Sequence, residues 1–259
     1  MTMRLMSPLK VFLAALGMLT AYGMAASGSA SAASLITFSS FLHGDLVPAT
    51  IDGVGFVVTN DAPTGFDEGR VFNTETTVST ADPDLQRDPI GSRENWKGGN
   101  LPVSTNLGNI LIIQEHDSSN PGTNPDDEGD RPAGRIMLTF TTAITEFGLD
   151  LVDIENGGTP EDDDGFLEFF SGGVSLGVRS FVGFATTNGG SGPAVFGDAT
   201  VNRIDPILAT SLGAASFDQI LVRMAGSGGI DNLAFTEVPL PGALLLLGSS
   251  LAGLGLVAR

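Results

Sequence analysis

Alternation of apolar and polar residues is the feature that most limits what this 259-residue chain can fold into. In an extended strand successive side chains point to opposite faces, so apolar residues at every second position indicate a half-buried β-strand. Four runs have this period, and their apolar positions are Ile136, Leu138 and Phe140; Phe147, Leu149 and Leu151; Leu167 and Phe169; and Ile220, Val222 and Met224. The chain is therefore predicted to be built from strands.

Turn-forming residues separate these runs at intervals of about ten residues. Glycine, asparagine and proline gather between them, while the continuous apolar runs at 54–58 and 110–113 suit strands buried on both faces. Short strands spaced in this way predict an all-β fold, a single antiparallel β-sandwich that is jelly-roll-like. Residues 74–105 and 117–134 are expected to be long loops.

Both ends of the chain have the composition of sorting signals. Residues 1–33 predict a secretory signal peptide, because Arg4 and Lys10 precede an apolar run and then small residues that permit cleavage. The exported domain is expected to span residues 34–237.

The last segment, residues 238–259, predicts a membrane-spanning sorting tail. Pro239 and Pro241 form a stiff entry after Val238, since proline fixes φ and opposes helix in the residue before it. The uncharged residues that follow would span roughly 26 Å as a transmembrane helix, enough for a thin membrane. Arg259 closes the chain and would stay on the cytoplasmic side.

This order of proline box, apolar span and basic end resembles the PEP-CTERM sorting signal, in its VPLPA-type variant, of exported Gram-negative bacterial proteins. The resemblance implies an exosortase-type protease that removes the tail, so that the inner-membrane anchor is transient and the protein reaches the cell surface or extracellular matrix. Leu240 stands where the Pro-Glu-Pro box has its glutamate, and one arginine replaces a basic cluster. An ordinary C-terminal membrane anchor is the alternative.

The central region is strongly acidic. All 30 Asp and Glu residues but only nine of the 12 Lys and Arg residues lie within 34–237, which leaves a net charge near −21. Such a surface repels phosphate backbones, so nucleic acid is excluded as a partner, whereas divalent cations are attracted. The chain has no cysteine, which excludes disulfides and thiolate metal sites.

Carboxylates that border apolar strands are the candidate metal ligands, because a charge there is costly without a partner. Calcium takes about six to eight oxygen ligands, which loops at one end of a sandwich can gather from distant segments. The members of the pairs Asp82/Asp84 and Asp153/Glu155 are two residues apart and project the same way in an extended chain. A calcium site is predicted among six carboxylates: Asp82, Asp84, Glu115, Asp153, Glu155 and Asp231.

Other acidic residues are expected to be solvated. Residues 126–130 and 161–164 form charged runs in loops, and such runs most often serve solubility. The segment that begins at Asp82 is no EF-hand, since it lacks the glycine and the glutamate that such a loop requires. A solvated, metal-free surface is the alternative for the six candidate ligands as well.

The sequence holds little that favours an enzyme. It has two histidines, His43 and His116, and neither a G-x-S-x-G elbow nor an H-E-x-x-H zinc helix. His116 lies beside two acids, but a solvent-facing histidine at a strand end is the more common case. Trp96, the sole tryptophan, lies in an expected loop, where it could stack on a sugar or, more often, pack the loop against the sandwich.

Five segments, DPDL, GNILIIQE, RIMLTF, FGLDLVDIE and GSGGIDNLAF, resemble the β-sandwich ectodomains of PEP-CTERM proteins and are similar to carbohydrate-binding and adhesin jelly rolls. This resemblance covers most of residues 35–236 and transfers no catalytic residue. It implies a non-enzymatic protein of the cell surface or extracellular matrix. The alternatives are a carbohydrate-binding module that contacts extracellular polysaccharide through Trp96 and, more remotely, a secreted hydrolase.

The sorting hypothesis predicts a processed C-terminus. Protein extracted from the cell surface should end near Val238 by mass spectrometry, and deletion of residues 238–259 should release the protein or leave it in the periplasm. A dominant mature form that still ends at Arg259 would contradict processing of the tail.

Overall fold

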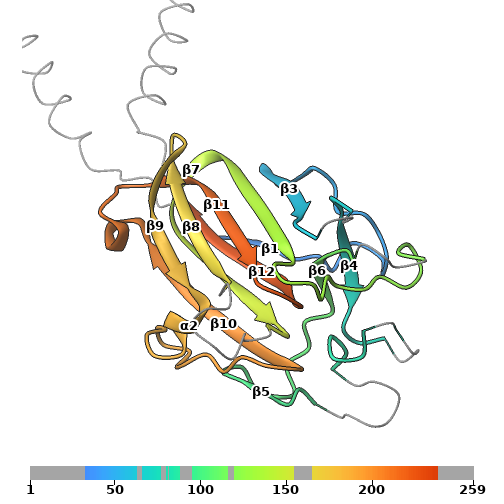
Figure 1. Cartoon of the computed structure of the whole chain (residues 1–259). Helices are drawn as coiled ribbons and strands as arrows, with labels where there is room; N and C mark the ends of the chain where they lie inside the picture. The colour runs from blue at the N-terminus through green and yellow to red at the C-terminus, as the bar shows by residue number, and fades with distance from the viewer. Residues whose placement is uncertain are drawn as a thin grey trace, which may run out of the picture. The chain divides into compact units, whose positions relative to one another are not determined.

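One long strand, β7 (Gly134–Val152), organises the fold. We describe it from a computed structural model that covers residues 33–62, 66–76, 80, 82–87, 95–115, 120–154 and 165–238. The first half of β7 pairs with β3 (Val54–Asn60) on one side and with β11 (Phe217–Met224) on the other. Its second half pairs with β12 (Gly229–Glu237) and with β10 (Thr200–Leu208), so β7 runs through two sheet halves (Figure 1).

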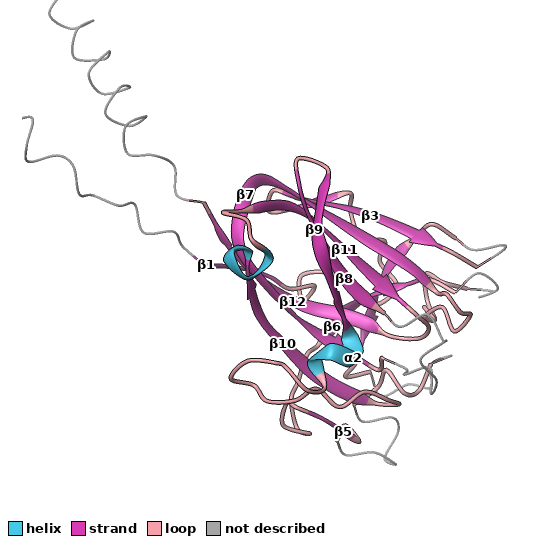
Figure 2. Ribbon diagram, turned by 60° about the vertical axis from the view of Figure 1, so that its left-hand side comes forward, coloured by secondary structure: helices cyan, strands magenta, loops and turns pink. Residues whose placement is uncertain are grey.

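Shorter strands extend both halves (Figure 2). In the first half, β2 (Thr50–Ile51) pairs with β3, and the hairpin of β8 (Phe166–Ser171) and β9 (Val174–Ser180) follows β11. In the second half, β12 also pairs with β1 (Ala33–Ile36) and β6 (Asn109–Ile113), and β4 (Gly69–Asn73) pairs with β6. These pairings are antiparallel, whereas β5 (Gly98–Gly99) pairs with β10 in parallel.

Regular helix is limited, within the described ranges, to two single turns. The α-helix α2 (Phe181–Phe184) follows β9, and the 3-10 helix η1 (Ala209–Leu212) follows β10. The predicted all-β, mainly antiparallel class is confirmed. The described residues include no helix long and apolar enough to cross a membrane. Residues 1–32 of the predicted signal peptide and the tail after Val238 lie outside the described residues, whereas its last residue, Ala33, begins β1 (Ala33–Ile36).

The apolar side chains of β7 change face along the strand. Ile136, Leu138 and Phe140 are buried in its first half, and Phe147, Leu149 and Leu151 are buried in its second half, which shifts the pattern from even to odd positions. The pairings of β7 with β11 and β12 both shift register in the intervening stretch. An extra residue in one strand of a pair moves the side chains that follow it to the opposite face. The two strands predicted from the sequence are therefore one strand whose inward face changes between its halves.

The inward faces of both halves share one hydrophobic core. Phe140 in the first half packs edge to face against Phe147 and Phe235, with ring centroids 6.2 and 5.0 Å apart. Phe169 and Phe217 make a similar contact at 5.1 Å. Such aromatic pairs add roughly 0.5–1.5 kcal/mol to the stabilisation from burial. The packing is sandwich-like.

A second apolar cluster covers the opposite face of the second sheet half. In β6, Leu111 and Ile113 face the main core while Ile110 and Ile112 face this second cluster, which explains the unbroken apolar run. The remaining members come from β4, β7 and β10, from the residue before β10 and from the chain that precedes β6, and they are Phe72, Leu85, Trp96, Leu107, Val152, Ala199 and Val201. The described parts of the segment 74–105 therefore cover the sheet and are not a free loop.

Trp96 belongs to this cover. Its side chain is 3% exposed, and its indole Nε1 donates a hydrogen bond to the carbonyl oxygen of Thr105 at 2.9 Å. The proposal that Trp96 stacks on a sugar is wrong for this structure, because no ring face is open to solvent. The more common alternative, packing of the loop against the sheet, is what the structure shows.

Truncation of Trp96 should therefore destabilise the fold. We expect Trp96→Ala to lower the free energy of unfolding by about 3–5 kcal/mol in urea denaturation, because it removes a large buried side chain and leaves a cavity. Phe66→Ala is the control, since Phe66 is 42% exposed and should contribute much less. Equal stability of Trp96→Ala and the wild type would contradict the core assignment.

Candidate functional site

Carboxylates from three distant segments converge beyond the end of β7. One ligand oxygen from each of Asp82, Asp126 and Asp127 lies within 4.8 Å of the others, a spacing that one metal ion could bridge. Asp153, the first residue after β7, and Asp84 are close enough to perturb the same carboxyls. We call these five residues the acidic cluster.

Local contacts fix Asp82 in the cluster. The carbonyl oxygen of Asp82 accepts a hydrogen bond from Thr80 Oγ1 at 2.8 Å, and a turn leads from there to Leu85, which is fully buried in the second apolar cluster. The Asp82 side chain is 6% exposed, and its Oδ2 atom is buried without a hydrogen bond from the described residues. A buried carboxylate oxygen without a donor is costly, so this atom indicates a missing proton or cation.

The loop that carries Asp126 and Asp127 is held along the end of β6. The Glu115 amide donates to the Asp126 carbonyl oxygen at 2.8 Å, and the Glu128 amide donates to the Ile113 carbonyl oxygen at 3.0 Å. The Asp127 carboxylate accepts hydrogen bonds from Ser227 Oγ at 2.7 Å and from the Gly228 amide. Backbone pairing therefore brings this acidic loop inward.

Asp153 is held by the chain after β7. Its φ of 53° is in the left-handed region, which aspartate tolerates better than most residues. Its Oδ1 accepts from the Ala199 amide, and its Oδ2 lies 3.1 Å from Ser227 Oγ. Ser227 also contacts Asp127, but a hydroxyl has one proton, so it satisfies only one of these carboxylates at a time.

The acidic cluster has too little positive charge around it. Within the described residues, Asp82, Asp84, Asp127 and Asp153 form no ion pair with Lys or Arg. Burial, followed by the charge of Asp127, raises the pKa of Asp82 far above its ordinary value and that of Asp153 to about 8. The cluster therefore requires protons or a cation to offset its repulsion.

The structure sorts the predicted ligands into different places. It brings Asp82, Asp84 and Asp153 together, as the sequence predicts, whereas Glu115 donates its backbone amide to Asp126 and is not among the grouped ligand atoms. Glu155 lies outside the described residues. Asp127 and Glu128 are 6% and 1% exposed, so the expectation that residues 126–130 are solvated is wrong for these two.

Asp231 belongs to a second buried group. It lies opposite Asp150 in the β12–β7 pair, and Asp150 binds the Arg203 guanidinium through both oxygens and accepts from Asn232 Nδ2 at 2.8 Å. Asp231 Oδ1 is buried without a hydrogen bond within the described part of the chain. Its place in a common site with Asp82 is therefore a wrong prediction, because register directs it toward Asp150.

The histidines offer no catalytic arrangement in the part of the chain that the structure describes. His43 Nδ1 accepts a hydrogen bond from the Asn73 amide at 3.0 Å, and its ring packs against Phe72 with centroids 5.2 Å apart. Burial lowers the pKa of His43. His43 is thus a neutral residue of the packed structure, and His116 lies outside the described residues.

Comparison with known proteins gives a distant structural likeness. No family model and no curated protein matches the sequence. Among solved structures, the K2 cleaved adhesin domain of Lys-gingipain is similar at 13% identity with a TM-score of 0.34, over 79% of this chain and 99% of that domain.

The buried Asp231 should make stability depend on pH. Burial raises its pKa to about 7, so between about pH 4 and 7 the folded chain holds a proton that the unfolded chain has lost. Stability from this group is full below pH 4 and is lost as the pH rises through 7. Asp231→Asn should make the decline in the free energy of unfolding between pH 5 and 7 less steep, measured in urea with a chelator present, and the raised pKa values of Asp82 and Asp153 account for the slope that remains. Asp52→Asn, at an exposed position, should leave the decline unchanged.

Proposed function

We propose that this protein is an exported, non-enzymatic domain of the cell surface or extracellular matrix whose fold is stabilised by calcium in the acidic cluster. The observation that carries the proposal is the unpartnered, buried Oδ2 of Asp82 among carboxylates whose oxygens lie within 4.8 Å of one another. At a finer level we assign the fold as a β-sandwich of the jelly-roll type, with the acidic cluster at one end of its second half.

The chemistry of the cluster favours calcium. Its ligands are hard carboxylate oxygens, and the chain has no cysteine for softer metals. Calcium binds oxygens at about 2.3–2.6 Å, so ligands on opposite sides of one ion are up to about 5 Å apart, in agreement with the observed spacing. Neutral oxygens of the backbone or water would complete the ligand set.

The ion would fasten the sheet cover. Asp82 and Asp84 lie on the segment that inserts Leu85 into the second apolar cluster, whereas Asp127 and Asp153 are attached to β6 and β7. An ion shared among them links the cover to the sheet, and its absence leaves their repulsion unopposed. Calcium binding is therefore expected to be coupled to the packing of Trp96, the sole tryptophan.

Export rests on the two terminal segments. The predicted signal peptide and the PEP-CTERM-like tail support transport across the inner membrane, transient anchoring and release by an exosortase-type protease. The carbohydrate-binding alternative has lost its residue-level support, since Trp96 is buried. A surface role with calcium as a structural ion agrees with the strong negative charge and with the acidic cluster.

Calcium should raise the melting temperature more than sodium chloride at equal ionic strength. A ligand that binds only the folded state stabilises it by about 2.7 kcal/mol at a hundredfold excess over Kd, which corresponds to several degrees for a domain of this size. Asp82→Asn and Asp127→Asn should remove the calcium-specific shift, and the exposed Asp52→Asn should retain it. Chelation should also move the Trp96 fluorescence toward longer wavelength.

Two outcomes would contradict the proposal. Equal shifts with calcium and with matched sodium chloride would show that the carboxylates respond only to screening. A calcium-specific shift that survives in both Asp82→Asn and Asp127→Asn would place the ion elsewhere.

A further inference from the structure

The outer edge of β9 carries unpaired backbone groups. β9 pairs with β8 on one side only, and the Phe181 amide donates to the Gly165 carbonyl oxygen at 2.8 Å at the start of this pairing. Because bonded and non-bonded pairs alternate along an antiparallel ladder, the backbone groups of Val178 and Ser180 face away from β8. The C=O of Val178 accepts from Arg179 and that of Ser180 caps the first turn of α2, so the two N–H groups are the ones that remain. These N–H groups can donate to the carbonyl oxygens of another extended chain.

Two other strand edges of the described chain, those of β10 and β4, are covered. At β10, the side-chain amides of Asn100 and Asn188 bind the backbone of Arg203 and Asp205, and Pro206 offers no N–H. At β4, residues 44–47 form three backbone hydrogen bonds along the outer edge. The outward N–H groups of β9 have no such cover among the described residues.

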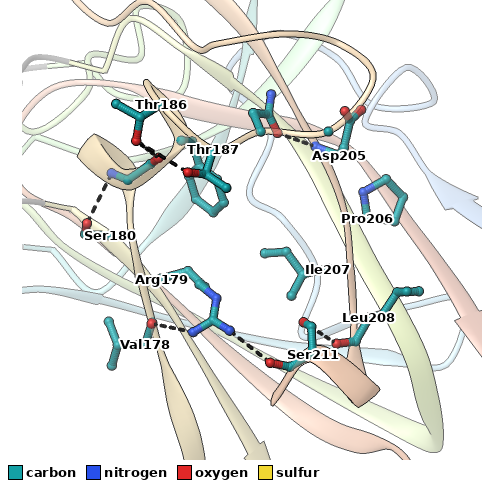
Figure 3. A pocket seen from close by; sticks show the side chains of 14 residues that line it. Val178, Arg179, Ser180, Thr186, Thr187, Asp205, Pro206, Ile207, Leu208 and Ser211 are labelled. Atoms are coloured by element: carbon teal, nitrogen blue, oxygen red, sulfur yellow. Dashed lines mark hydrogen bonds between the residues drawn. The ribbon is translucent and has the colours of Figure 1, made fainter. Parts of the chain in front are cut away.

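A groove runs beside this edge (Figure 3). Its volume is about 660 Å³, and its walls come from β9, α2, β10 and η1. Val178 and Leu208 line it and are 46% and 49% exposed, and Ile207 lies between them and the Asp205 wall. Aliphatic side chains beside a free strand edge are the features that bind an extended polypeptide.

Arg179 supplies a positive charge in the groove. Its guanidinium donates to the carbonyl oxygens of Val178 at 3.1 Å and Ser211 at 3.2 Å, and within the described residues it has no carboxylate partner. This is unusual in so acidic a chain, where six other basic side chains form ion pairs: Arg70, Arg87, Lys97, Arg135, Arg203 and Arg223. The remaining N–H groups of Arg179 suit a carboxylate.

We propose that the β9 edge and its groove bind an extended segment of a partner protein, which accepts hydrogen bonds from the N–H groups of Val178 and Ser180, places aliphatic side chains against Val178 and Leu208, and directs one carboxylate to Arg179. A second copy of the chain fits less well, since it would bring a further net charge near −21, whereas a short segment brings a single carboxylate. At physiological salt, charges more than about 8 Å from the bound segment are largely screened. The nearby Arg179 therefore has the largest electrostatic effect on the carboxylate of that segment.

A synthetic peptide tests the surface directly. The probe has seven residues, the length of β9, and alternates valine and threonine around one central glutamate. Titrated into the full domain with calcium present, it should cause saturable NMR shifts at Val178, Arg179 and Ser180. The peptide with glutamine in place of glutamate should bind about tenfold more weakly, the value of a charge-assisted hydrogen bond.

Matched variants separate the strand edge from the charge. Ser180 has φ −68°, which proline can adopt, so Ser180→Pro removes one outward N–H without changing the backbone path. Ser180→Ala loses the same hydroxyl but keeps the N–H, and it should bind the peptide several-fold more tightly than Ser180→Pro. Arg179→Gln should weaken binding of the glutamate peptide about tenfold and leave the glutamine peptide unaffected, whereas Arg179→Lys should lose less.

Three results would overturn the proposal. The first is no saturable shift up to about 1 mM peptide. The second is equal binding by Ser180→Pro and Ser180→Ala when their melting temperatures agree. The third is a concentration-dependent dimer that buries β9 and excludes the peptide, which would identify a second copy as the occupant. Each result leaves the calcium measurements unaffected, so failure here is distinct from failure of the proposed function.

Discussion

The change of face along β7 is the constraint on which the other elements depend. Even-numbered side chains up to Phe140 and odd-numbered ones from Phe147 enter the same core, so the two halves of one strand can serve two sheet halves. The partners of the first half, β3 and β11, differ from those of the second half, β10 and β12. Without the register shift, one half would turn its phenylalanine and leucine side chains away from the core.

The end of β7 also sets the electrostatics. Asp153 follows the last residue of β7, and its carboxylate lies near that of Asp127. Asp150, three residues earlier, lies opposite Asp231 and binds Arg203. Asp150 thus has an arginine partner, whereas Asp153 forms no ion pair with Lys or Arg among the described residues. That difference makes the acidic cluster, and not the Asp150–Arg203 pair, the candidate metal site.

Part of the candidate site could be predicted from the sequence. Asp82, Asp84 and Asp153 are adjacent to apolar residues, and a charge at such a boundary needs a partner, so their convergence followed from local reasoning. Asp127 gave no such signal, because its run of neighbouring acids looks like any solvated loop. Only the bonds between residues 126–128 and the end of β6 carry it inward. Asp231 shows the reverse case, since strand register assigns it to Asp150.

The sequence by itself determined the all-β class, the apolar faces of the strands and the acidic character of the domain, because side-chain period and charge are local properties of the chain. The tertiary structure decided that the two alternating runs form one strand, that Trp96 is buried under a loop, and that β9 keeps outward N–H groups beside Arg179. These outcomes depend on which segments meet across long separations. That choice is made by the packing of the whole core, which no short stretch of residues encodes.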